Sequence, residues 1–152
     1  MMRILVCGGR DYGKVDARRP IDHPKKMAER RRLRSVMNEL LMEFGAFQLI
    51  HGGAGGTDAL AGGWATDTPG MPLPKVYLAD WNDLSAPDAV IKVAKGGPNK
   101  GKQYDANAGP RRNTKMLVEG RPDLVVAFPG GRGTADMVGK AREAKVEVRE
   151  IQ

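Results

Sequence analysis

The 152-residue chain has a mass of 16.5 kDa, which suffices for one domain with its own core but not for two ordinary ones, so we expect a single domain over residues 1–152. Hydrophobic residues at 41% and charged residues at 28% exclude a disordered or fibrous chain. Lys and Arg outnumber Asp and Glu by 25 to 18, and the formal charge of +7 favours an anionic partner such as a nucleotide, a nucleic acid or an acidic membrane.

The cysteine content and the apolar runs indicate the compartment. The one cysteine, Cys7, lies within the first apolar run, so we expect no disulfide and a buried thiol in a reducing cytosol. The run over residues 4–7 is too short for a signal peptide, and no run approaches the roughly 18 apolar residues of a membrane-spanning helix. We therefore expect a cytoplasmic protein without a membrane partner.

The first predicted strand, residues 3–7, stops at Gly8 and Gly9, and Arg10 and Asp11 follow at once. This junction lacks the third glycine and the immediate helix of a dinucleotide-binding fingerprint. We interpret it as a turn in which Arg10 and Asp11 are candidates for ligand contact.

A basic insertion and helix follow over residues 12–34, with Lys14, Arg18, Arg19, Lys25, Lys26, Arg30, Arg31, Arg32 and Arg34. Pro20 and Pro24 break any earlier helix, and we expect a helix to begin near Pro24. Apolar residues spaced by three and four from Met27 onward form its buried face, and Gly45 offers a stop. We expect a solvated basic face that steers small anions, because Tyr12 is its single aromatic residue and offers no stacking platform. Nucleic-acid binding is the alternative.

The second predicted strand, residues 47–50, ends in His51-Gly52-Gly53-Ala54-Gly55-Gly56-Thr57-Asp58 before an Ala-rich helix. With Thr57 or Asp58 as the N-cap, the glycine amides would be free for a ligand; the alternative is a flexible loop without one. His51 is either a base or ligand contact, or a hydrogen-bonded structural group.

A third strand is predicted over residues 74–78, and Trp81 beyond it is a core residue, or it stacks on a base or walls a pocket. Residues 82–108 are rich in loop signals, with one short helix expected over 86–94, and we interpret them as a mobile basic lid. Residues 96–102 fit the letters GxxxxGK but form no P-loop, because Gln103 replaces the required Ser or Thr and Pro98 interrupts the loop.

The last third of the chain contains the strongest ligand signal. Pro110 suits the first turn of a helix that runs to Gly120, with Arg112 and Asn113 near its start. A strand over residues 124–128 then leads into Pro129-Gly130-Gly131-Arg132-Gly133-Thr134, a helix to about residue 144 and a last strand over 146–151. Glycines that admit a ligand, free helix amides and the helix dipole together predict phosphate binding at this turn.

Strands that alternate with helices predict a Rossmann-like three-layer α/β fold with a mostly parallel sheet of about five strands. Ligands bind such sheets at the carboxyl ends of the strands, where the strand order reverses. We therefore expect the three glycine-rich junctions to converge on one site.

Five motifs carry a family resemblance: Gly9-Arg10-Asp11, the glycine-rich stretch from His51 to Asp58, Ala79-Asp80-Trp81, Ala108-Gly109-Pro110-Arg111-Arg112-Asn113 and Phe128 to Thr134. In order and character they resemble the YspA/YpsA-related (DUF2493) branch of the SLOG superfamily, which is common in bacteria and phages. The resemblance covers nearly the whole chain. It implies a Rossmann-like fold, a nucleotide or nucleotide-derived ligand, of which NAD-related and ADP-ribose-like molecules are examples, a homodimer or higher homo-oligomer, and a bacterial or phage-infected cell.

The chain is also distantly similar to the LOG phosphoribohydrolases, which cleave a nucleoside monophosphate into base and ribose phosphate. The resemblance makes Arg112 the nearest match to their arginine, whereas Met137 stands where they have a glutamate three residues after the Thr of PGGxGT. Met cannot steady positive charge on a ribose or direct water, and Asp136 lies about 100° away around the helix. Asp11, Asp58 and Asp136 are the carboxylates that could stand in.

We therefore predict a ligand-binding or sensing domain that captures a small phosphorylated nucleoside and needs no cofactor. The predicted ligand- and phosphate-binding residues are Gly8, Gly9, Arg10, His51, Gly52, Gly53, Gly56, Thr57, Asp58, Trp81, Arg112, Asn113, Pro129, Gly130, Gly131, Arg132, Gly133 and Thr134. A hydrolase that uses Arg112 with Asp11, Asp58 or Asp136 is the first alternative, and a nucleic-acid-binding accessory protein is the second. No metal site is expected, because His23, His51 and Cys7 show no ligand spacing.

Overall fold

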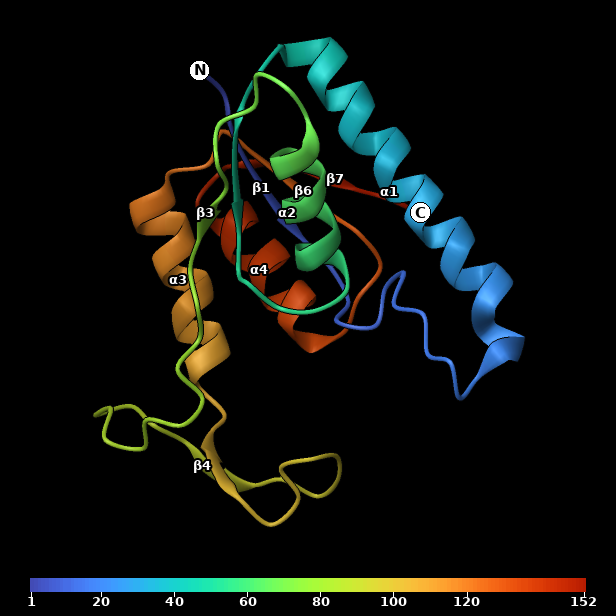
Figure 1. The fold of residues 1–152 in the computed structure, drawn as a ribbon. Helices are drawn as coiled ribbons and strands as arrows, with labels where there is room; N and C mark the ends of the chain where they lie inside the picture. Colours follow the sequence, from blue (N-terminus) through green and yellow to red (C-terminus); the bar gives the residue numbers. More distant parts are fainter.

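The computed structural model describes residues 1–152 and contains a five-stranded sheet in which all neighbouring strands are parallel (Figure 1). In spatial order the strands are β3 (Lys75–Val76), β2 (Gln48–His51), β1 (Arg3–Cys7), β6 (Leu124–Ala127) and β7 (Glu147–Glu150). The predicted Rossmann-like α/β fold with a mostly parallel sheet is confirmed.

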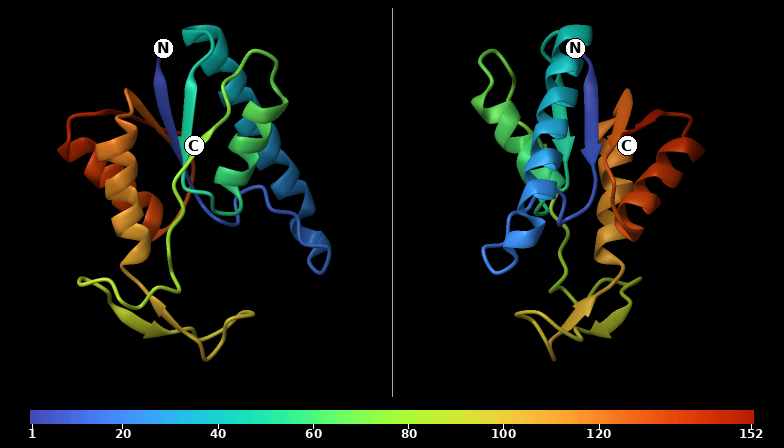
Figure 2. Two further views of the ribbon diagram at one scale, coloured as in Figure 1. Left: turned by 60° about the vertical axis from the view of Figure 1, so that its left-hand side comes forward. Right: turned by 90° about the vertical axis from the view of Figure 1, so that its right-hand side faces the viewer.

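Helices cover both faces of the sheet (Figure 2). The helices α1 (His23–Phe44) and α2 (Thr57–Asp67) lie on one face, and α3 (Ala108–Gly120) and α4 (Arg132–Glu143) lie on the other. The alternation of side chains along β1 explains both layers, because successive residues of a strand point to opposite faces. Ile4 and Val6 pack in the cluster beneath α1 and α2, whereas Leu5 and Cys7 pack beneath α3 and α4.

The basic helix α1 follows the expected pattern. A short 3-10 helix, η1 (Pro20–Asp22), precedes it, and the helix itself begins next to Pro24 and ends before Gly45. Its buried side chains are Leu33, Val36, Met37 and Leu40, spaced by three and four residues. The basic side chains of Arg31, Arg32 and Arg34 are exposed on its outer side.

The order of the strands reverses between β1 and β6. From β1 the chain moves to β2 and β3 on one side, and it then returns to β6 and β7 on the other. Cys7 at the end of β1 pairs with Ala127 at the end of β6, and Gly9 N–H donates to the Pro129 carbonyl at 2.9 Å. Two of the glycine-rich junctions are therefore joined at the position where such sheets bind ligands.

The helix expected over residues 86–94 is absent, and this prediction was wrong. The structure instead has an antiparallel hairpin of β4 (Ile91–Val93) and β5 (Gln103–Asp105), which projects from the end of the sheet toward which the strands point (Figures 1 and 2). The buried Asp105 carboxylate holds the hairpin, because it accepts hydrogen bonds from the N–H groups of Val90 and Asn107 and forms an ion pair with Arg111 of α3.

None of the helices combines the length and apolar composition needed to cross a bilayer.

Candidate functional site

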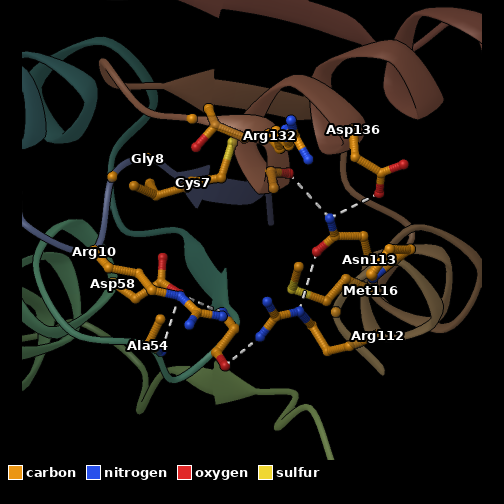
Figure 3. Close-up of a pocket in the computed structure, with 18 of the residues that line it drawn as sticks. Cys7, Gly8, Arg10, Ala54, Asp58, Arg112, Asn113, Met116, Arg132 and Asp136 are labelled. Atoms are coloured by element: carbon orange, nitrogen blue, oxygen red, sulfur yellow. Dashed lines mark hydrogen bonds between the residues drawn. The ribbon is translucent and has the colours of Figure 1, made fainter. Parts of the chain in front are cut away.

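A cleft of about 580 Å³ opens at the carboxyl ends of β1, β2 and β6, between the N-terminal ends of α3 and α4 (Figure 3). All three glycine-rich junctions contribute to its wall, as expected. Twelve predicted binding residues line it: Gly8, Gly9, Arg10, Gly52, Asp58, Trp81, Arg112, Asn113, Gly131, Arg132, Gly133 and Thr134. The other six predicted binding residues, His51, Gly53, Gly56, Thr57, Pro129 and Gly130, belong to two of the same junctions but do not line the cleft.

The N-terminus of α4 forms one side of the cleft. Its N-cap residue is Gly131, and no side chain caps the helix. Counted from Gly131, the first backbone N–H that has a hydrogen-bond acceptor within the protein is that of Ala135, which donates to Gly131 O. The N–H groups of residues 131–134 are the free donors that every helix has in its first turn, and all four residues line the cleft. A Cβ on Gly131 or Gly133 would meet no atom within 4 Å, so these two glycines leave the approach to the amides open.

The guanidinium of Arg112 reaches across the cleft from α3 (Figure 3). Its Nη1 donates to the Gly52 carbonyl at 2.6 Å and more weakly to Tyr77 O at 3.4 Å, and its Nε donates to Asn113 Oδ1 at 3.1 Å. All these acceptors are neutral, and no carboxylate pairs directly with Arg112. Burial and the nearby charge of Arg10 lower its pKa, while Asp58 acts in the opposite direction.

Asn113 links α3 to α4 beneath the cleft. Its side chain is 4% exposed, and Nδ2 donates to Gly133 O at 3.2 Å and to Asp136 Oδ2 at 3.0 Å. The same Asp136 oxygen accepts a bond from Lys140 Nζ at 2.8 Å. Asn113 is thus a structural link whose amide is fully bonded, and Asp136 is the candidate carboxylate on the α4 side of the cleft.

The glycine-rich loop after β2 differs from the prediction. The N-cap of α2 is Gly56 and neither Thr57 nor Asp58, and no side chain caps the helix. Asp58 Oδ2 instead accepts the N–H groups of Gly52 at 3.2 Å and Ala54 at 3.1 Å, while His51 Nδ1 accepts Gly53 N–H at 3.0 Å. The amides of Gly52 and Gly53 are therefore bonded within the protein, and the expectation that the glycine amides are free for a ligand was wrong for these two. The N–H groups of Gly55 and Gly56 have no acceptor within the protein.

Burial shifts the titration of the groups beneath this loop. Asp58 and His51 are each 7% exposed; burial raises the pKa of Asp58 despite its two backbone bonds and lowers the pKa of His51 despite the nearby Asp58. Burial and Asp58 also raise the pKa of the Cys7 thiol to about 12, so Cys7 at the cleft floor is a neutral thiol. His51 is hydrogen-bonded to the loop backbone, and it does not line the cleft.

The loop after β1 and the start of α2 pack closely against each other at Gly8, Gly56 and Thr57. The Thr57 backbone N–H and Oγ1 both donate to Gly9 O at 3.1 Å, which ties α2 to the loop after β1. A Cβ on Gly56 would overlap the carbonyl oxygens of Gly9 and Arg10, and one on Gly8 would overlap Thr57 Oγ1. These glycines let two loops approach each other beneath the cleft.

Trp81 forms part of the cleft wall opposite the sheet. Trp81 is half-buried, and the guanidinium carbon of Arg10 lies 4.9 Å from the centre of its ring. The ring centres of Trp81 and Tyr104 of β5 are 6.4 Å apart. Gly109 at the start of α3 allows this packing, because a Cβ there would lie 2.7 Å from the indole. Trp81 therefore lines the cleft and is not a core residue.

Two predicted features lie elsewhere. Asp11 is exposed and does not line the cleft; its carbonyl oxygen accepts a bond from Lys26. Met137 is fully buried between α4 and the sheet, so this position faces the core and not the ligand side. Of the two neighbouring residues Asp136 and Met137, only Asp136 lines the cleft.

Sequence reasoning also missed some residues of the cleft. Gly109 and Met116 line it but were not among the candidates. Their spacing from Arg112, three residues before and four after, places all three on one face of α3. The helical period could have identified both.

The parallel sheet and the cleft at its switch point define a Rossmann-like protein, and the cleft lies at the carboxyl ends of the strands, where proteins of this fold bind ligands. A family model described as the YspA, cpYpsA-related SLOG family matches residues 2–83, and the chain belongs to this family, as the sequence motifs indicated. Membership indicates a nucleotide-related ligand-binding or enzyme-like function. Searches of curated proteins and of solved structures gave no match. The matched residues extend from β1 through Trp81, so Arg112 and the α4 N-terminus lie outside them.

Proposed function

We propose that the protein binds a phosphorylated nucleoside in this cleft as a ligand-binding or sensing domain. The observation that carries the proposal is the convergence of four free amides, residues 131–134, with an arginine that no carboxylate pairs. Phosphate oxygens accept bonds from both kinds of donor, and a bond that involves a charged group is about twice as strong as a neutral one. Arg10 adds a second positive charge at the rim.

The apolar part of the cleft supports a nucleoside in preference to free phosphate. Trp81, Met116, Val6 and Cys7 line it beside the amides. An indole wall suits the flat face of a base, and a nucleotide, NAD or an ADP-ribose-like molecule carries both a base and a phosphate. In this proposal Gly52 and Gly53 support Arg112, and the ligand lies between Trp81 and α4.

Calorimetric titration with AMP, ADP-ribose, NAD and cyclic nucleotides tests the proposal. We expect at least one of them to bind and Arg112→Ala to weaken it by about 10- to 100-fold, because a hydrogen bond to a charged group contributes about 1.5–3 kcal/mol. The control is Lys115→Ala, which removes an exposed positive charge from the same helix. Equal affinity in wild type and Arg112→Ala, or no binding of any phosphate ligand, would contradict the proposal.

Two glycines of α4 allow the effect of a substitution on ligand access to be distinguished from its effect on stability. Gly133 and Gly139 both lie in α4, and a Cβ on either meets no atom within 4 Å, but only Gly133 lines the cleft. Alanine at either position should preserve the fold and add up to about 1 kcal/mol of helix stability. Only Gly133→Ala should weaken ligand binding, by about tenfold, because its methyl group stands between the ligand and the amides.

Hydrolysis of an N-glycosidic bond is the second candidate, and the position of Asp136 in the cleft favours it. We nevertheless expect no release of free base from nucleoside monophosphates or NAD, because Asp136 is bonded to Asn113 and Lys140 and Asp58 is bonded to backbone amides. Chromatography after prolonged incubation with these substrates measures the amount of free base released. Base release that disappears in Asp136→Asn would establish the enzyme.

The basic segment, residues 14–34, is the part of the chain that would bind nucleic acid in the alternative function. Residues 14–34 contain nine Lys and Arg but three Asp and Glu, so they carry six of the seven excess positive charges. We expect only weak retention of DNA or RNA in a gel shift at about 150 mM salt, because phosphate contacts alone are screened and no aromatic platform adds stacking. Tight binding that is lost when Arg30, Arg31, Arg32 and Arg34 become Ser would reverse this expectation.

A further inference from the structure

We propose that Asp58 and His51 are positioning residues that hold the Arg112 guanidinium in the cleft through the backbone of residues 52–54. The effect on ligand affinity rests on the proposed function, whereas the effect on Arg112 itself does not. The place of Arg112 in the cleft is set by a backbone carbonyl, Gly52 O.

Arg112 depends on the Gly52 carbonyl for its orientation. The short bond from Nη1 to Gly52 O at 2.6 Å and the bond from Nε to Asn113 Oδ1 at 3.1 Å lie on the same rigid, planar group. If Gly52 O moves, the plane turns and the Nε bond is lost as well. A carboxylate partner would hold the group by charge, but no ion pair involves Arg112, so the position of this one carbonyl matters.

Side chains of β2 and α2 fix that carbonyl. Three successive N–H groups donate to them: those of Gly52 and Ala54 to Asp58 Oδ2, and that of Gly53 to His51 Nδ1. Gly53 has a φ of +71°, so this loop is unusual in conformation and needs specific partners to hold it. Figure 3 shows Asp58 on the side of the loop opposite Arg112, with Ala54 next to it.

Close packing leaves the two positioning side chains little freedom. A Cβ on Gly62 of α2 would lie 2.8 Å from His51 Nε2, so the helix backbone lies against the imidazole. A Cβ on Gly52 would overlap the Arg112 guanidinium on the other side of the loop. The imidazole, the loop and the guanidinium are thus stacked in contact, and a shift at one end reaches the other.

The Asp58 substitutions distinguish a positioning role from a chemical one. Both Asp58 bonds go to one oxygen, and Asn offers an oxygen of the same geometry without the charge. Asp58→Asn should therefore keep the loop and Arg112 in place, whereas Asp58→Ala removes both bonds. A carboxylate that acted on the ligand by its charge or its proton would be lost equally in both variants.

The experiment measures two quantities: the solvent exchange of the Arg112 side-chain N–H and the affinity for AMP. The side-chain Nε–H signal of Arg112, assigned by its loss in Arg112→Lys, is followed by nuclear magnetic resonance, and AMP affinity is measured by calorimetry. In Asp58→Ala we expect solvent exchange of this N–H to rise at least about tenfold and AMP affinity to fall about tenfold, since at least one orienting hydrogen bond is lost. Asp58→Asn should stay within about threefold of wild type in both.

Two further variants complete the test. His51→Ala removes one of the three loop bonds, should raise the same exchange rate by a smaller factor, and serves in place of Asp58→Ala if that variant does not fold. Asp67→Ala removes an exposed carboxylate from the far end of α2 and should change neither readout.

The outcomes separate this inference from the proposed function. An Arg112 signal that stays protected in Asp58→Ala overturns the positioning role, as does an Asp58→Asn variant that is as defective as Asp58→Ala. If wild type binds neither AMP nor any other of the four phosphate ligands but Asp58→Ala still exposes the Arg112 N–H, the proposed function is wrong and the positioning role stands.

Discussion

Gly56→Ala is expected to lower the free energy of unfolding by about 3–5 kcal/mol, a large part of the roughly 5–15 kcal/mol that stabilises a domain. Gly56 has a φ of +64°, and its added Cβ would overlap the carbonyl oxygens of Gly9 and Arg10. Both obstacles are backbone, which cannot move aside as the end of a flexible side chain can. Thermal or urea unfolding measures the change.

The neighbouring Gly55 provides a matched control. Its φ is not in the left-handed region, and the nearest atom to its added Cβ is Arg10 O at an ordinary 3.5 Å. Gly55→Ala should therefore change stability by less than about 1 kcal/mol, in either direction. Equal stability of the two variants would show that Gly56 does not join the loops after β1 and β2 as the structure indicates.

The main elements of the fold follow from local patterns in the sequence. The short apolar run that stops at Gly8 predicted β1 with the bounds that the structure has, and the spacing of three and four predicted α1 to within one or two residues. The hairpin of β4 and β5 could not be found this way, because it depends on Asp105 bonding to Val90, fifteen residues earlier, and to Arg111. Such a buried polar anchor leaves no periodic signal.

The candidate site was predictable in place but not in its internal bonding. Glycine junctions at strand ends indicated where the loops meet, since parallel strands end at one edge of a sheet. The same glycines predicted free amides, and this was right for residues 131–134 but wrong for Gly52 and Gly53. Composition cannot distinguish the two cases, because it does not show that Asp58 and His51 turn back onto their own loop.

The two neighbouring residues of α4, Asp136 and Met137, show the same limit. The sequence placed them about 100° apart on a helix but could not say which one faces the ligand side. The structure places Asp136 at the cleft and Met137 fully inside the core with Leu5 and Val125. Introducing the glutamate of the LOG enzymes at position 137 therefore tests the orientation of α4.

Met137→Glu is expected to destabilise the protein by about 4 kcal/mol or more, enough to leave much of it unfolded, because a carboxylate would be buried among apolar side chains without a partner. Met137→Leu should cost less than about 1.5 kcal/mol, and Asp136→Glu, which keeps its charge at the cleft, should remain folded. Burial raises the pKa of an unpaired carboxyl, so the loss in Met137→Glu should be largest at neutral pH and diminish as the pH falls and the group is protonated. Urea unfolding at several pH values measures all three variants. A stable Met137→Glu protein with no such pH dependence would mean that position 137 faces solvent, and Met137 would then again count against hydrolysis in this family member.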